Sequence, residues 1–419
     1  MRRALALALG LLALVTACSV PRSGAGSRTF TIGAVYPLSG PQATGGREEL
    51  SGVQLALDLA REHNLLGSRT VKLVVRDATT PTAAVSAVDN LIDTQHVDML
   101  IGTYGSTLAE AAAAEADRRH VVYWETGAVS DGVTMNKRYV FRTVAAGSTL
   151  GNTAVEFVAA VLLPQQKLHA GDTRAAIVYV NDAYGKSVAF AEAARARSHG
   201  IPVVAMLPYD AAFYDASTIA SQIAAARPDF LFDVSYIDDG VAIWQQVVRQ
   251  HVKLRAAVGT SSAFCMPAFA ERVGPAAAGV YAADKPDEQV NAGALSPAAK
   301  ALLGAARTRY AATHSGAQLS IPVMAGLVGG WTLFYDVLPQ LGAKTDSETI
   351  RSAALRVDVA VSGAPNGGGV RFGTPGSADE GQNQLAASEV GQWELVNGRM
   401  DMRILYPAAY ASDHPMIHS

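Results

Sequence analysis

Ser106 and Thr107 carry hydroxyls at the predicted N-terminus of a helix, a position that can bind an anion. They follow an apolar run at residues 99–101, which we expect to be a buried strand, and a glycine-containing turn at residues 102–105. An alanine-rich segment typical of a helix comes directly after them. Because a helix N-terminus presents unpaired N–H groups and partial positive charge, it suits a carboxylate. The alternative is an ordinary cap, either Ser106 or a capping box of Thr107 and Glu110.

The sequence lacks the common catalytic patterns. Its nine histidines do not cluster with one another or with cysteines, so we predict no metal site. It has no GxSxG turn, and no GxGxxG follows a predicted strand. Val180 stands where a phosphate loop ending at Gly185-Lys186-Ser187 would need glycine. We therefore expect a binding protein without cofactor or metal rather than an enzyme.

The elements that would position such a site alternate between strand and helix. Strands joined by helices of crossover length predict a parallel sheet covered on both faces. The pattern occurs twice, with strands expected at residues 29–36, 71–77, 99–101, 121–124 and 139–143, and again at 175–180, 203–207, 230–234 and 256–259. Later segments read as helices at 297–314, 323–341 and 347–356. Near the end, Asn397-Gly398 predicts a type I′ hairpin between residues 389–396 and 400–405.

Composition is consistent with two globular domains. The chain has 419 residues, of which 49% are hydrophobic and 17% charged, which is enough for two cores. A net charge of -3 gives no reason to expect a nucleic-acid partner. The apolar run at residues 321–328 is interrupted by Pro322 and Gly326, so we expect no membrane span after the N-terminus.

The N-terminus has the form of a secretory signal: two arginines, an apolar run at residues 4–15, and Cys18 after small residues. Val15-Thr16-Ala17-Cys18 resembles the bacterial lipobox, which implies that Cys18 is lipidated; an ordinary signal peptide is the alternative. Residues 19–28 read as a flexible tether. We therefore expect an extracytoplasmic, lipid-anchored protein, on the outer face of the cytoplasmic membrane or in the periplasm. Cys265 is then left alone and predicted to be buried.

Five short motifs stand in a characteristic order: IGAVYPLSGP at residues 32–41, the unit at 102–116, FRT at 141–143, NDAYG at 181–185, and Gln382-Asn383. In this order they resemble the solute-binding proteins of ABC importers, in the branched-chain amino-acid (Leu/Ile/Val) binding family, over about residues 29–410. The resemblance implies the type I periplasmic-binding-protein fold: two Rossmann-like α/β lobes joined by three crossovers, with a ligand cleft between them. Lobe one would comprise residues 29–145 plus 279–385, and lobe two 146–278 plus 386–419.

The resemblance also implies ligand contacts. Ser106 would bind the carboxylate of the ligand, and the backbone at Gly127 and Val129 would contact both its carboxylate and its amino group. From lobe two, Tyr184 and Tyr236 would close over the ligand.

One matching position departs from the family pattern. Where the family has an acidic residue for the ligand's ammonium group, this chain has Ser261. A hydroxyl cannot neutralise a desolvated cation, so either another carboxylate replaces it or the ligand is not an α-amino acid. The candidate carboxylates are Asp238 with its neighbour Asp239, Asp182, and Glu125, each of which could instead cap a helix, shape a turn or face solvent. Tyr104 could line the cleft with aromatic surface.

The expected function is binding of a small polar solute, an amino acid or a related amide or carboxylate, and its delivery to an ABC importer by hinge closure. The implied partners are the small-molecule ligand, a membrane permease, and the membrane itself through Cys18. A sensor of the same fold with a signalling partner is the first alternative. An amidase-type enzyme is less economical because the catalytic residues are missing.

Overall fold

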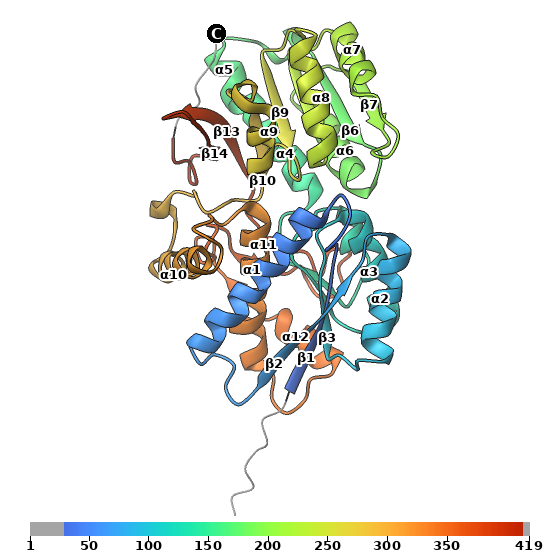
Figure 1. Cartoon of the computed structure of the whole chain (residues 1–419), viewed down its shortest axis with the longest axis vertical. Coiled ribbons are helices and arrows are strands. Elements are labelled where there is room, and N and C mark those ends of the chain that lie inside the picture. Colours follow the sequence, from blue (N-terminus) through green and yellow to red (C-terminus); the bar gives the residue numbers. More distant parts are fainter. Residues whose placement is uncertain (1–28, 414–419) are drawn as a thin grey trace, which may run out of the picture.

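The computed structural model describes residues 29–413, which form two α/β lobes stacked end to end (Figure 1). Lobe one is the lower body of the figure and contains both the first strand and the helices that follow residue 296. The predicted signal peptide, the lipidation site Cys18 and the tether lie outside the described residues.

Lobe one is built on a parallel sheet of five strands in the order β2-β1-β3-β4-β5. The strands are β1 (Thr29–Tyr36), β2 (Thr70–Asp77), β3 (Met99–Gly102), β4 (Tyr123–Glu125) and β5 (Val140–Arg142), close to the predicted ranges. Successive residues of β1 face opposite sides, since Ile32 and Ala34 pack in one core and Val35 in another. The sheet is therefore covered on both faces, as its apolar strands require.

Two groups of helices cover this sheet. One face packs against α2 (Pro81–Asp93) and α3 (Ser106–Arg118). The other packs against α1 (Ala43–Glu62), α10 (Pro297–Thr313), α11 (Ile321–Trp331) and α12 (Ser347–Ala354). The core of lobe one thus joins the first part of the chain to segments that come much later.

Lobe two contains a sheet of seven strands in the order β14-β13-β10-β9-β8-β6-β7. Its strands are β6 (Ala175–Val180), β7 (Val203–Tyr209), β8 (Phe230–Val234), β9 (Ala256–Thr260), β10 (Tyr281–Asp284), β13 (Glu389–Val396) and β14 (Arg399–Tyr406). The first five are mutually parallel, and β13 and β14 add an antiparallel edge. The covering helices are α4 (Gly147–Phe157), α6 (Ala183–Ser198), α7 (Ala216–Ala226), α8 (Ile237–Arg249) and α9 (Pro267–Val273).

The predicted terminal hairpin is confirmed. Val396 pairs with Arg399 across a two-residue turn, and Asn397 (φ 51°) and Gly398 (φ 79°) both adopt the left-handed conformation that a type I′ turn needs. Two very short strands, β11 (Asp358–Val359) and β12 (Val370–Arg371), form a separate antiparallel pair in lobe one.

The chain passes between the lobes near residues 143–146, 285–296 and 383–388. β10 pairs with β9 and β13, so the second crossing lies after Asp284 and not at residue 279 as expected. The first and third crossings touch. Asn383 Nδ2 donates to Thr143 O (2.7 Å), and Arg142 Nε donates to Gln382 Oε1 (2.7 Å), so two of the sequence motifs meet at the hinge.

The helical stretch Ile321–Gln340 is long and apolar enough, by length and composition alone, to pass as a membrane span, and most of it is buried inside lobe one. The expectation that Pro322 and Gly326 would interrupt this run is wrong. Pro322 lies in the first turn of α11, where proline is tolerated. At Gly326 a Cβ would come within 2.0 Å of Glu49 O, so glycine allows α11 to pack closely on α1. The stretch is thus a core helix of lobe one.

Candidate functional site

One small cavity between the lobes is lined by seven of the nine predicted ligand residues. Its lining is Tyr104, Ser106, Gly127 and Val129 from lobe one, Tyr184, Tyr236, Ser261 and Ser262 from lobe two, and Lys285 from the second crossing. The space open to the centre of a water molecule is about 10 Å³, which is room for about one water. The lobes are therefore closed on each other, and a larger ligand requires them to separate.

Ser106 is the first residue of α3, and its hydroxyl faces the neighbouring loop. Ser106 Oγ accepts hydrogen bonds from the backbone N–H groups of Val129 (3.3 Å) and Ser130 (3.1 Å). Within residues 29–413 no acceptor takes the hydroxyl proton, so Ser106 can donate it to a ligand.

The expected capping arrangements at this helix are wrong. The cap position is Gly105, without a side-chain bond, and Glu110 instead accepts from the Ser130 hydroxyl. Thr107 Oγ1 is buried and has no partner in the described chain. Val129 and Ser130 donate hydrogen bonds to Ser106 and Glu110, which therefore do not cap the helix. A capping pattern in the sequence cannot reveal donors from this separate loop.

Glu125, which was predicted as a ligand contact, does not line the cavity, because its carboxylate is bonded within lobe one. Its Oε1 accepts from the N–H groups of Gly127 and Ala128 (2.8 Å each), and its Oε2 accepts from the N–H of Thr103 (2.8 Å). Burial raises the pKa of Glu125 well above its usual value. The residue fixes the shape of the loop that lines the cavity.

Gly127 lies between the cavity and a second buried carboxylate. A Cβ at this position would come within 1.7 Å of Glu49 Oε2, so no other residue fits without displacement. Glu49 belongs to α1 and accepts from the Thr126 hydroxyl (2.6 Å). Burial raises the pKa of Glu49 to about 7.

Arg142 supports the same loop from the hinge. Its side chain is buried, and Nη1 donates to Ser130 O and, at 3.4 Å, to Ala128 O. The loss of hydration lowers the pKa of Arg142 to about 10. Because Arg142 also bonds Gln382, the loop is tied directly to two interlobe crossings.

The two tyrosines of lobe two present rings to the cavity while their hydroxyls are bonded elsewhere. Tyr184 OH donates to Thr260 O (2.5 Å), and Tyr236 OH donates to Asp182 Oδ2 (2.7 Å). Their ring centroids are 5.3 Å apart. Asp182 also caps α6 through the N–H of Gly185 (2.9 Å), so it shapes the turn and positions Tyr236. The second lobe therefore contributes mainly aromatic surface.

Tyr104 and Ser261 also line the cavity, one from each lobe. The Tyr104 ring lies over Gly45 of α1, where a Cβ would come within 2.2 Å of it. Ser261 and Ser262 follow β9 with φ of 38° and 39°, a left-handed conformation that non-glycine residues adopt rarely and that concentrates at functional sites. The predicted contact residues Tyr104 and Ser261 are thus both at the cavity.

Asp238, which was predicted as a substitute carboxylate, does not line the cavity. It forms an ion pair with Arg272 (2.6 Å), and its side chain is 67% exposed. Its neighbour Asp239 is buried and bonded by the Tyr209 hydroxyl, also away from the cavity. Both lie in the first turn of α8, where acidic residues are favourable.

Lys285 is the functional candidate that sequence reasoning missed. It follows β10 at the second crossing, and its side chain is only 7% exposed. A lysine directly after a short apolar strand was the available signal, but this strand was not recognised. Charged residues at the carboxyl end of a strand in a parallel sheet are natural candidates for ligand binding.

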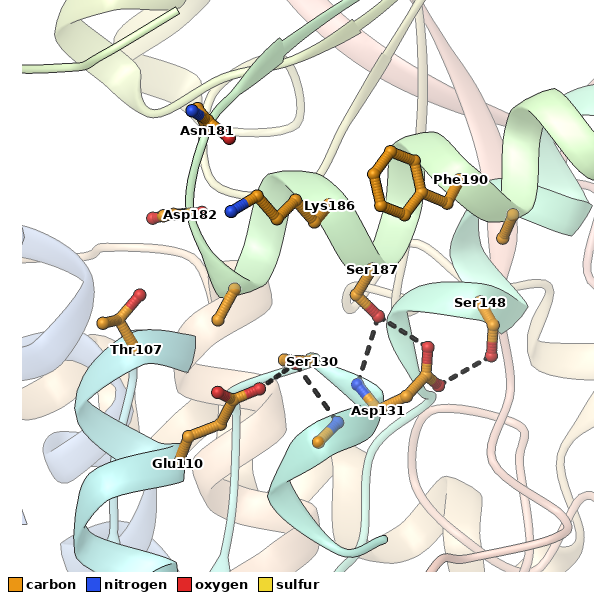
Figure 2. A pocket seen from close by; sticks show the side chains of 13 residues that line it. Thr107, Glu110, Ser130, Asp131, Ser148, Asn181, Asp182, Lys186, Ser187 and Phe190 are labelled. Carbon is orange, nitrogen blue, oxygen red and sulfur yellow. Dashed lines mark hydrogen bonds between the residues drawn. The ribbon is translucent and has the colours of Figure 1, made fainter. Parts of the chain in front are cut away.

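A second, much larger hollow lies between the lobes and is open to solvent. Its volume is about 870 Å³, and Figure 2 shows its lining residues. Asp131 of lobe one accepts from the hydroxyls of Ser148 (2.7 Å) and Ser187 (2.6 Å) of lobe two. We call this set of three residues the Asp131 latch, since it joins the lobes beside the hinge.

Comparison with known proteins gives a family assignment. The family model described as periplasmic binding protein matches residues 29–387. Among curated relatives, Leu/Ile/Val-binding protein homolog 8 of Brucella melitensis biotype 1 is 28% identical over 365 residues, which cover 86% of this chain and 87% of the relative.

Solved structures show the same fold. The leucine-binding protein LivK from Thermotoga maritima has a TM-score of 0.75 and 19% identity, over 90% of this chain and 99% of that one. A solute-binding protein of an ABC transporter from Rhodopseudomonas palustris BisB5, solved with 3,4-dihydroxybenzoic acid, has a TM-score of 0.74 and 17% identity, over 93% and 98%. The expected type I fold is confirmed, and the chain belongs to the periplasmic binding protein family.

Proposed function

We propose that this protein binds a small solute in the cavity around Ser106 and delivers it to an ABC permease by opening and closing its two lobes. The observation that carries the proposal is the composition of the cavity. Ser106 and the Gly127–Val129 loop come from lobe one, and Tyr184 and Tyr236 come from lobe two. A ligand touching both sets stabilises the closed state over the open one, which is the physical basis of a closure signal.

In this proposal Ser106 donates its hydroxyl proton to an anionic or carbonyl oxygen of the solute. The Ser106 hydroxyl has already been oriented by two backbone donors, so little order is lost on binding. The rings of Tyr184 and Tyr236 then cover the apolar part of the solute. The proposal includes no chemical conversion.

The proposal places the protein outside the cytoplasm with Cys18 as its lipid anchor, so that it works beside its permease. Replacement of Cys18 by Ala tests the anchor. The wild-type protein is expected in the membrane fraction with a lipid-dependent mass increase, and the Cys18→Ala variant is expected in the soluble fraction.

Binding itself is tested with a panel of amino acids, small amides and carboxylates on the purified full chain. A ligand that binds only the native state raises the melting temperature. We expect at least one class to do so, with Ser106→Ala losing the shift. The matched control is Ser198→Ala, at the exposed end of α6, which should keep it. A shift that persists in Ser106→Ala places the solute elsewhere and contradicts the proposed site.

A further inference from the structure

The ammonium group of Lys285 lies inside the cavity and touches both lobes. Its Nζ is 3.4 Å from Gly127 O of lobe one and 3.4 Å from Ser261 Oγ of lobe two. It is also 3.3 Å from Asp284 Oδ1. The side chain is nearly fully buried, so these three oxygens replace most of the water that an exposed lysine would have.

All three contacts are longer than a good charge-assisted hydrogen bond, which measures about 2.7–2.9 Å. Gly127 O and Ser261 Oγ carry no full charge. The carboxylate of Asp284 does, but the ion pair is loose at 3.3 Å, and its Oδ1 also accepts the N–H of Lys285 (2.7 Å). Lys285 Nζ is therefore paired with Asp284 but has no short charge-assisted hydrogen bond. A carboxylate that entered the cavity could form the short bond that these groups do not provide.

Two of the residues that Lys285 contacts, Gly127 and Ser261, also bear on the ligand's amino group. They are two of the positions near which the sequence resemblance places that amino group, and the resemblance also gives Gly127 a contact with the ligand's carboxylate. In this chain a protein ammonium group already occupies the space between them. A second ammonium group there would meet a like charge in a medium that screens it poorly.

We infer that the cavity is selective for small carboxylates without an ammonium group, and that Lys285 determines this preference. The inference rests on the proposed function and specifies its ligand class. The carboxylate would lie between the Ser106 hydroxyl and Lys285 Nζ. The rings of Tyr104, Tyr184 and Tyr236 would contact a short aliphatic or aromatic body.

Two other buried carboxylates lie near the lysine. Asp284 is beside it but does not line the cavity, and its Oδ2 has no hydrogen-bond partner among residues 29–413. Glu49 lies behind Gly127, and burial favours its neutral form. Asp284 is thus the group that could receive an ammonium, and the test must address it.

The test compares three probes that share one carbon skeleton: leucine, 4-methylpentanoate, which lacks the amino group, and 3-methylbutylamine, which lacks the carboxylate. Benzoate is added as an aromatic carboxylate. Titration calorimetry on the purified full chain should show that a carboxylate probe binds at least about tenfold more tightly than leucine, and that the amine does not bind.

The Lys285→Met variant keeps the length of the side chain and removes its charge. It should lose at least about tenfold in carboxylate affinity and lose the preference over leucine. The Lys285→Arg variant keeps the charge and should retain the preference. Melting temperatures without ligand show whether each variant is folded.

The inference is overturned if leucine binds wild type more tightly than 4-methylpentanoate, particularly if Asp284→Asn abolishes that binding. It is also overturned if Lys285→Met leaves carboxylate affinity unchanged, or if neither carboxylate binds. The first two outcomes leave the proposed function standing, because a solute still binds between the lobes. The proposed function fails separately, if no member of the wider panel binds.

Discussion

The two hollows between the lobes differ in size and in chemistry. The Ser106 cavity has room for about one water molecule and is lined by hydroxyls, aromatic rings and a buried lysine. The groove at the Asp131 latch is about 870 Å³ and open to solvent, and its acidic groups Glu110 and Asp131 are bonded to neighbouring serines. The cavity is smaller but brings a buried lysine together with a backbone carbonyl of one lobe and a hydroxyl of the other. The difference shows that volume alone is a poor guide to the chemistry of a hollow between two lobes.

The largest effect is expected on the pH dependence of stability, through Glu49, the buried acid behind the cavity. Since burial raises the pKa of Glu49 from 4.5 to about 7, its stabilising neutral form is present at low pH and is lost as the pH rises through about 7. As the pH rises from 4.5 to about 7, the unfolding free energy should therefore fall by about 3 kcal/mol. Urea unfolding from pH 5 to pH 8 should show a steeper loss for wild type than for Glu49→Gln. Parallel curves for the two proteins would contradict this.

The second effect is on affinity at the cavity. Ser106→Ala removes the hydroxyl proton offered to the solute, and a hydrogen bond to a charged group is worth about 1.5–3 kcal/mol. We expect a loss of about 10- to 100-fold in affinity for the solute found by screening, measured by calorimetry. A loss of affinity below threefold would mean that the Ser106 hydroxyl, like the bonded acids of the groove, does not bind the solute.

The third effect concerns the latch in the groove. Ser187→Ala removes one hydroxyl that bonds Asp131 across the lobes, at a cost of about 1 kcal/mol to the closed state. Affinity should fall by about fivefold through this shift in population, and small-angle scattering without ligand should show a larger radius of gyration. If affinity and scattering both stay the same, the latch does not contribute to closure.

The smallest effect is expected at Asp238. Its ion pair with Arg272 is exposed and lies outside both hollows, and pairs of this kind contribute little. Asp238→Asn should keep solute affinity within about twofold of wild type in the same calorimetric assay. A larger loss would restore Asp238 as a contact residue.

Local signals in the sequence predicted most of the fold. The Asn397-Gly398 hairpin and the alternation of strands and helices depend on residues that are close along the chain. Helix ends were less accurate: the helix expected at residues 323–341 begins at Ile321, with Pro322 in its first turn, where proline is tolerated.

The site was predictable only where a residue acts at its own strand or helix end. Ser106 was predicted from its place at a helix start after a strand, and Tyr184 from the family resemblance; each lies in the first turn of a helix and lines the cavity. The position of Asp238 outside the cavity was not predictable because its partner, Arg272, lies 34 positions away. Glu125 bonds the nearby N–H groups of Gly127 and Ala128, and only the folded loop shows this. Lys285 was not predictable from the sequence because its place in the cavity depends on the pairing of β10 with β9 and on Gly127 of the other lobe.

The core of lobe one has a consequence for the time at which the chain can fold. Phe30, Met99 and Phe141 share a core with Val323, Ile350 and Phe372, so the face of the first sheet that carries α1 is covered completely only when the last third of the chain is present. Folds that depend on such distant contacts form slowly. A polypeptide that must cross a membrane before it works outside benefits from this delay, because an open chain can be threaded through a pore and a finished lobe cannot.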